Sequence, residues 1–156
     1  FLLAFVESTL LSSITVFRHG ARSPVNSFNW DTGNWPRGLG ELTLEGMIQE
    51  YNLGLKLKNH YQSSDCGFDI NNISKEIYVR SSDSKRAIVS AQFFLMGFLS
   101  SESLYPKELF ESLAFPPKYI LDDEKFNLYV IELPNSHTKV EVYSMKKKLD
   151  HMLVGW

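Results

Sequence analysis

The sequence predicts an α/β fold in which a parallel sheet is flanked by helices, because strand-like and helix-like segments alternate along the first half of the chain. The segments Ile14–Phe17 and Glu76–Val79 are short, β-branched and aromatic, which is typical of buried strands. A segment with apolar residues at helical spacing follows each of them. The order strand, loop, helix, strand, helix is characteristic of parallel strands joined by crossover helices.

The first helix is predicted to begin after Thr43, which is a suitable N-cap residue. The loop before it spans residues 26–40 and contains glycine and proline breakers. Gly46 and Gly54 lower the helix propensity, so we expect packing to supply much of the stability of this helix. Its apolar face is formed by Leu44, Met47, Ile48, Tyr51 and Leu55.

The second predicted strand ends at Arg80, and Ser81–Asp83 then offers an N-cap for a second helix. The buried face of that helix is predicted to comprise Ile88, Ala91, Leu95 and Phe98. Residues 62–75 read as a polar loop. Two later strands are predicted at 128–131 and 139–143, and the tail 145–156 is predicted to form a short amphipathic helix.

Composition restricts the class of protein. The 156 residues are 44% hydrophobic and 22% charged, which fits one globular domain without repeats. A net charge of -2 argues against a nucleic-acid partner, and the basic run Lys146–Lys148 is interpreted as a solvated face. The single cysteine, Cys66, cannot form an internal disulfide. The sequence leaves the oligomeric state open.

The N-terminal residues indicate a route of export. The run 1–6 is apolar but too short to span a bilayer, so 1–13 is predicted to be the remnant of a signal peptide and 14–156 the domain itself. The alternative is that 1–6 forms a first strand. An N-glycosylation sequon begins at Asn72 and gives weak support for a secreted or lysosomal glycoprotein.

The clearest chemical signal lies directly after the first predicted strand, in the run Arg18-His19-Gly20-Ala21-Arg22. Ligands of open α/β sheets bind beyond the carboxyl ends of strands, which is where this run is expected. Guanidinium groups match phosphate oxygens in bidentate geometry, so a histidine between two of them would be held near a bound phosphorus atom. The competing interpretation is a surface turn with ion-paired arginines.

The run resembles the hallmark R-H-G-x-R-x-P of the histidine acid phosphatases, a branch of the phosphoglycerate-mutase-like superfamily, and Pro24 completes it. Two further segments resemble the family: Trp35–Gly54, with its W-P-x-G-x-G-x-L-T-x-x-G-M pattern, and Tyr78–Ala91, with R-S-x-D-x-x-R-x-x-x-S-A. The resemblance covers residues 14 to about 98. It implies a phosphoglycerate-mutase-like fold, of which this chain carries an incomplete, N-terminal portion.

The resemblance also implies roles for four residues. His19 would be the nucleophile, and Arg18, Arg22 and Arg80 would bind the phosphate oxygens. The implied reaction is hydrolysis of small phosphate monoesters through a phosphohistidine, without a metal or other cofactor. The separated histidines His60, His137 and His151 do not suggest a metal site either.

Other polar residues near these motifs are given structural interpretations. Ser23 is interpreted as a turn residue, Asp83 as a helix cap and Arg86 as its ion-pair neighbour. The acidic run Asp122–Glu124 is interpreted as solvated loop.

One part of the family pattern is missing. Family members carry a later His-Asp or His-Glu dipeptide whose acid protonates the leaving oxygen, and this sequence has none; Asp150-His151 has the reverse order. General acid catalysis contributes about 10²–10⁴-fold. The alternative function is therefore a truncated, non-catalytic phosphate-binding or secreted binding protein. A phytase-like specificity would call for additional basic residues, which the sequence does not show.

Overall fold

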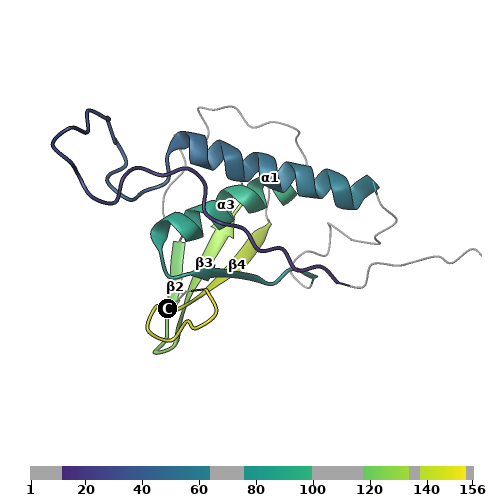
Figure 1. The fold of residues 1–156 in the computed structure, drawn as a ribbon. Coiled ribbons are helices and arrows are strands. Elements are labelled where there is room, and N and C mark those ends of the chain that lie inside the picture. Colours follow the sequence, from purple (N-terminus) through teal and green to yellow (C-terminus); the bar gives the residue numbers. More distant parts are fainter. Residues whose placement is uncertain (1–11, 64–75, 100–117, 134–137, 154–156) are drawn as a thin grey trace, which may run out of the picture.

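The computed structural model describes residues 12–63, 76–99, 118–133 and 138–153, which form two helices on one face of a four-stranded sheet (Figure 1). Helix α1 (Leu44–Ser63) packs on helix α3 (Lys85–Leu99), and α3 packs on the sheet. The α/β class is confirmed. The predictions for residues 1–11, the loop with Cys66 and Asn72, and His137 lie outside the described residues.

The sheet is mixed, not parallel as predicted. Its order is β1 (Val79–Ser82), β4 (Lys139–Met145), β3 (Phe126–Glu132) and β2 (Lys118–Asp122), and only β1 and β4 run parallel. The reason is the length of the connections. The links between β2 and β3 and between β3 and β4 are too short for a crossover, so these strands must pair antiparallel. The predictions of strands at 128–131 and 139–143 are confirmed.

Helix α1 begins where the sequence predicts. The Thr43 hydroxyl accepts a hydrogen bond from the amide of Gly46 at 3.2 Å, and the Thr43 carbonyl accepts one from Met47 at 3.0 Å. Met47 and Tyr51 are buried in the core. Leu44, Ile48 and Leu55 pack against the core from its border, so the predicted apolar face is confirmed.

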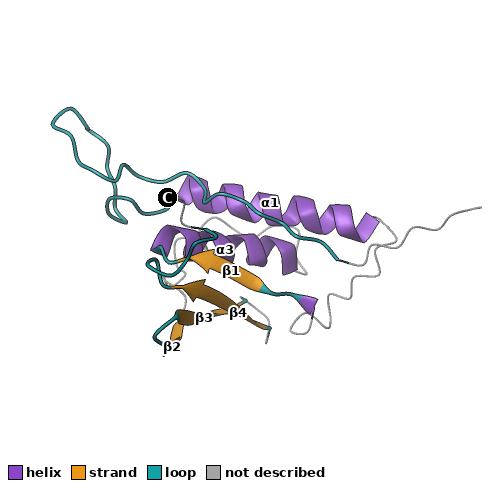
Figure 2. Cartoon of the chain, turned by 60° about the horizontal axis from the view of Figure 1, so that its bottom comes forward, coloured by secondary structure: helices purple, strands orange, loops and turns teal. Residues whose placement is uncertain are grey.

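Helix α3 is the middle layer of the molecule (Figures 1 and 2). All residues from Ile88 to Leu99 are buried, including the four of the predicted face, because α1 covers one side of this helix and the sheet the other. The helix begins after Ser84, whose carbonyl accepts the amides of Ala87 and Ile88. Ser84 therefore holds the N-cap position, one residue beyond the predicted Ser81–Asp83.

Three other predicted elements differ from the structure. Ile14–Phe17 is irregular: Ile14 is 92% and Val16 80% exposed, because the segment passes over the helices and not along a strand edge (Figure 2). Phe17 anchors it by stacking on Phe94 with ring centroids 4.5 Å apart. Strand β1 begins at Val79, later than predicted, since its pairing with β4 starts there. The described part of the tail, 146–153, forms turns and no helix.

Within the described residues, neither helix combines the length and the apolar character needed to cross a bilayer.

Glycines set the distance between α1 and α3. A Cβ atom at Gly54 would lie 2.1 Å from the carbonyl oxygen of Phe94, and one at Gly97 would lie 2.0 Å from that of Tyr51. Real Cβ contacts are never this short, so the backbones of the two helices touch at these points. The low helix propensity of Gly54 is therefore offset by close helix packing.

Gly97→Ala tests this contact. In an ordinary helix interior the change stabilises by about 0.5–1 kcal/mol. Here the methyl group must displace the backbone of α1, so we expect the free energy of unfolding to fall by about 1–3 kcal/mol. Urea denaturation measures it, with Asn52→Ala on the exposed side of α1 as the control. A Gly97→Ala chain as stable as the parent would contradict the contact.

A buried carboxyl group in α1 makes stability depend on pH. Glu50 is 3% exposed, and its Oε2 atom has no hydrogen-bond partner among the described residues. Burial raises the pKa of Glu50 from 4.5 to about 7. Between these values the folded chain binds more protons than the unfolded chain, so stability falls as the pH rises through this window.

Glu50→Gln should remove this dependence. We expect similar free energies of unfolding for both chains at pH 4 and a gain of up to about 3 kcal/mol for the variant at pH 8. Denaturation at both pH values measures the difference, and Glu45→Gln on the exposed side of α1 is the matched control. An unchanged slope of stability against pH in Glu50→Gln would show that Glu50 is not the group responsible.

Candidate active site

The segment that carries His19 rests on the first turns of α1 through two glycines. A Cβ atom at Gly20 would lie 2.3 Å from the carbonyl oxygen of Gly46, and one at Gly46 would lie 2.1 Å from that of Ala21. Neither position can accept a side chain without moving backbone. The contact therefore sets the distance between the backbone of the His19 segment and that of α1.

Hydrogen bonds complete this attachment. The Ala21 carbonyl accepts bonds from the amide and the hydroxyl of Thr43, both at 3.0 Å. The amide of Ala21 donates to Gln49 Oε1 at 2.9 Å, and that of Gly20 donates to Ser90 Oγ of α3 at 3.3 Å. Both helices therefore orient the backbone beside His19. No motif in the sequence singles out Gln49, although its position three residues after Gly46 places it on the same side of α1.

The ring of His19 is oriented by its own segment. Its Nδ1 atom lies 2.8 Å from the carbonyl oxygen of Gly20. A carbonyl only accepts, so this contact selects the tautomer in which Nδ1 carries the proton. In that neutral tautomer Nε2 holds a lone pair. The half-buried ring thus has the form that a nucleophilic imidazole needs.

The two arginines that flank His19 differ in environment. Arg18 is exposed, whereas Arg22 is half-buried and pairs with Leu42 in an isolated β-bridge. Arg22 donates from Nη1 to the carbonyl of Ser23 at 2.8 Å, and its buried Nε has no hydrogen-bond partner among the described residues. A buried donor without an acceptor is costly, and an anionic ligand would satisfy it.

Ser23 has the structural role that the sequence predicts. Its side chain is buried, and its hydroxyl donates to the Gly38 carbonyl at 2.7 Å and accepts from the Glu41 amide at 3.2 Å. These bonds close the base of the loop 25–40. Gly38 and Gly40 have φ angles of 97° and 73°, which other residues rarely adopt. The loop therefore leaves and re-enters the fold beside the His19 segment.

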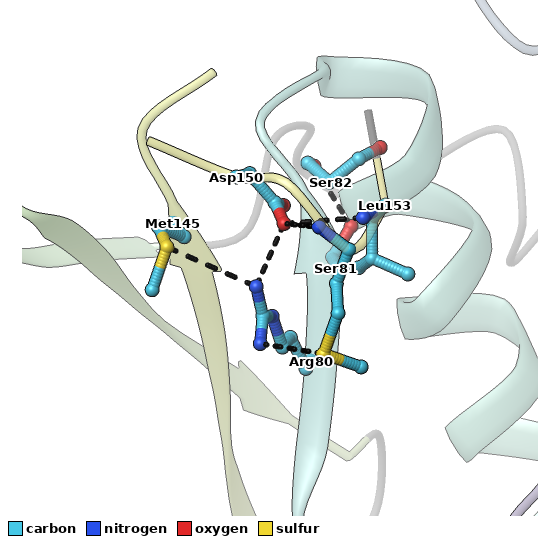
Figure 3. A network of polar contacts seen from close by, with 7 residues as sticks. Arg80, Ser81, Ser82, Met145, Asp150 and Leu153 are labelled. Carbon is cyan, nitrogen blue, oxygen red and sulfur yellow. Dashed lines mark hydrogen bonds and ion pairs between the residues drawn. The ribbon is translucent and has the colours of Figure 1, made fainter. Parts of the chain in front are cut away.

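Arg80 lies within β1 and has partners of its own (Figure 3). Its Nη2 forms an ion pair with Asp150 Oδ1 at 2.7 Å. Arg80 pairs with Tyr143 in the register, and alternation places it on the sheet face away from α3. The His19 segment contacts α1 and α3 instead. The polar contacts of the described residues thus join Arg80 to the tail and not to residues 18–22, and the role of Arg80 stays a prediction.

Two acidic residues outside the candidate site, Asp83 and Asp123, have structural partners. Asp83 accepts a hydrogen bond from Asn127 of β3 at 3.3 Å, which ties the start of α3 to the sheet. Asp123 accepts the amide of Lys125 at 3.0 Å and so forms the turn between β2 and β3. In the described ranges, no three histidine, cysteine or acidic residues gather in a way that could hold a metal ion.

Comparison with known proteins agrees with these features. Testicular acid phosphatase of Homo sapiens is 29% identical over 160 residues, which cover 98% of this chain and 37% of that protein. Putative acid phosphatase 5 of Caenorhabditis elegans is 42% identical over 106 residues, which cover 67% of this chain and 21% of that protein. Lysosomal acid phosphatase of Bos taurus is 37% identical over 100 residues, which cover 62% of this chain and 23% of that protein.

The chain therefore spans 37% or less of the length of these relatives. A family model matches residues 9–149, which include the His19 segment, both helices and the whole sheet. The matched range contains the R-H-G-x-R-x-P run around His19. The chain therefore belongs to the histidine phosphatase superfamily, branch 2.

Proposed function

We propose that the chain is an acid phosphatase that hydrolyses small phosphate monoesters through a phosphohistidine at His19. The observation that carries this proposal is the 2.8 Å contact between His19 Nδ1 and the Gly20 carbonyl, which leaves Nε2 with its lone pair. The named relatives are acid phosphatases. The name of one, lysosomal acid phosphatase, supports the lysosomal alternative of the proposed lysosomal or secreted location.

The reaction proceeds in two steps. In the first, Nε2 of His19 attacks phosphorus, the ester P–O bond breaks, and the leaving oxygen takes a proton from solvent. In the second, water attacks the phosphohistidine, which releases inorganic phosphate and restores Nε2. Arg18 and Arg22 neutralise the charge of the phosphoryl oxygens in both steps.

The absence of a His-Asp or His-Glu dipeptide from these 156 residues affects the choice of substrate. Without a positioned acid, an alkoxide leaves slowly, and the lost contribution is about 10²–10⁴-fold. A phenolate with a low pKa needs less protonation. Aryl phosphates with such leaving groups are therefore the substrates on which turnover by this chain is measured best.

His19→Ala tests the nucleophile. Brief exposure to a ³²P-labelled aryl phosphate at acid pH, followed by an alkaline quench in which phosphohistidine survives, should label the parent chain. We expect no label in His19→Ala, because the atom that forms the P–N bond is gone. His60→Ala, which changes a histidine at the far end of α1, should keep the label.

The fold of each variant is checked by circular dichroism before labelling. Label retained by a folded His19→Ala chain would show that another residue is phosphorylated. A folded parent chain that takes up no label but binds inorganic phosphate would support the alternative of a phosphate-binding protein.

A further inference from the structure

We propose that Glu50 is a pH-dependent positioning residue for the His19 segment, residues 17–22. When its carboxyl group is neutral, the segment packs on α1. When the carboxyl group is ionised, the segment is displaced from the helix. This inference rests on the proposed function, in which His19 is the nucleophile, and it adds a control of that nucleophile by pH. Glu50 acts through the segment and not on the substrate, so it is not a catalytic residue.

Glu50 lies at the junction of α1, α3 and the His19 segment. It follows Gly46, where the backbone of the segment touches α1, by one helical turn, and it precedes Gly54, where the backbone of α3 touches α1, by another. At about 3.6 residues per turn, the direction of Glu50 from the helix axis falls between those of the two glycines. Glu50 is 3% exposed. Its side chain is therefore enclosed between the two neighbours of α1.

The His19 segment covers this junction. Phe17 stacks on Phe94 of α3 with ring centroids 4.5 Å apart, and the Gly20 amide donates to Ser90 Oγ of the same helix at 3.3 Å. Ser90 and Phe94 are one turn apart, so the segment follows α3 between them before it reaches α1. Figure 2 shows this course of the chain over the helices. Movement of the carboxyl group, or entry of water beside it, thus acts directly on the backbone of the segment.

The carboxyl group of Glu50 lies without a balancing charge in the described part of the chain. Its Oε2 atom is buried and forms no hydrogen bond with any described residue. Burial raises the pKa of Glu50 from 4.5 to about 7. The charged or titratable groups that α3 and the His19 segment carry are those of Arg18, His19, Arg22, Lys85 and Arg86. None of them offsets the effect of burial, so an ionised Glu50 is a buried charge without a counter-ion.

The packed segment leaves no room to hydrate this charge. A Cβ atom at Gly20 would lie 2.3 Å from the carbonyl oxygen of Gly46, so backbone touches backbone beside the carboxyl group. Water reaches an anion there only if one of the neighbours moves. Helix α3 is fixed by a buried core, whereas residues 12–16, which lead into the segment, are all exposed. The segment is therefore the weaker neighbour and the part that opens.

The direction of the effect follows from two pKa values. Beneath the packed segment the pKa of Glu50 is about 7, and beside a displaced segment, where water reaches the carboxyl group, it returns toward 4.5. The packed state holds the proton between these values, and its advantage is lost as the pH rises through this window. Between pH 5 and pH 8 the ratio of displaced to packed chains rises by about tenfold to a hundredfold. Displacement breaks the hydrogen bonds of Gly20 and Ala21, which orient the backbone beside His19.

Hydrogen exchange of the Gly20 and Ala21 amides tests the displacement without reference to activity. We expect their protection factors to fall by about tenfold to a hundredfold between pH 5 and pH 8 in the parent chain and to stay constant in Glu50→Gln. At pH 8 in the parent they should also be less protected than the amide of Leu95, which lies in the core. Glu45→Gln, on the exposed side of α1, is the matched control and should behave as the parent.

The pH profile of activity tests the consequence. Dividing kcat/KM of Glu50→Gln for an aryl phosphate by that of the parent cancels the titration of the substrate and of His19. We expect this ratio to be about one at pH 5 and to reach about three or more at pH 8, since the variant cannot ionise. Glu45→Gln should give a ratio of about one at both pH values.

Three results would overturn the proposal. Equal protection of Gly20, Ala21 and Leu95 at both pH values would show that these amides exchange by unfolding of the whole chain. A ratio of activities that does not change with pH would show that Glu50 has a structural role alone. Should Glu50→Gln not fold, constant protection of Gly20 and Ala21 in the parent between pH 5 and pH 8 would refute the displacement.

Failure of the proposed function is a separate outcome. Absence of label on His19 in a folded parent chain at pH 5 would refute the phosphohistidine mechanism. The exchange of Gly20 and Ala21 would still report whether the segment responds to Glu50.

Discussion

The structure depends on direct backbone contact at three glycine positions along α1 and α3. Gly46 and Gly54, two turns apart on α1, face the His19 segment and α3, and Gly97 of α3 faces α1. At each point a Cβ atom would overlap a carbonyl oxygen. Glycine is the residue that permits such an approach, at the cost of helix propensity. The layers and the site therefore share one constraint, since Gly46 supports the segment that carries the candidate nucleophile.

The orientation of the His19 ring follows from this close packing. Because the segment lies directly on the helices, Thr43 and Gln49 beside α1 and Ser90 of α3 form hydrogen bonds with its backbone. The fixed backbone presents the Gly20 carbonyl to Nδ1 of the ring. A nucleophilic imidazole needs a defined tautomer more than a particular partner, and here backbone geometry defines it. The side chains of Thr43, Gln49 and Ser90 thus act on His19 by fixing the main chain beside it.

Charge is distributed unevenly among the arginines. Arg22 has a buried Nε without an acceptor in the described part of the chain, whereas Arg80 is neutralised by Asp150. An ion pair with one partner fully buried is stronger than a surface pair, but its incomplete hydrogen bonding leaves it open to exchange. Arg22 therefore has a donor that an anion could satisfy, whereas the charge of Arg80 is already paired.

The local sequence was sufficient for both helices, for Thr43 as the cap of α1 and for strands β3 and β4, because helical spacing, capping and β-branched runs act over a few neighbouring residues. It did not predict β2. The motif around His19 was equally local, since its residues are adjacent in the chain.

Tertiary structure decided what depends on distant partners. Ile14–Phe17 has the composition of a strand, yet in the structure it lies on the helices and pairs with no strand edge. The sheet is mixed because short links force β3 to pair antiparallel with both neighbours. Asp150 meets Arg80 across 70 residues, and no local pattern encodes such a contact. Strand pairing and ion pairing need two segments to meet in space, and only the packing of the whole chain brings them together.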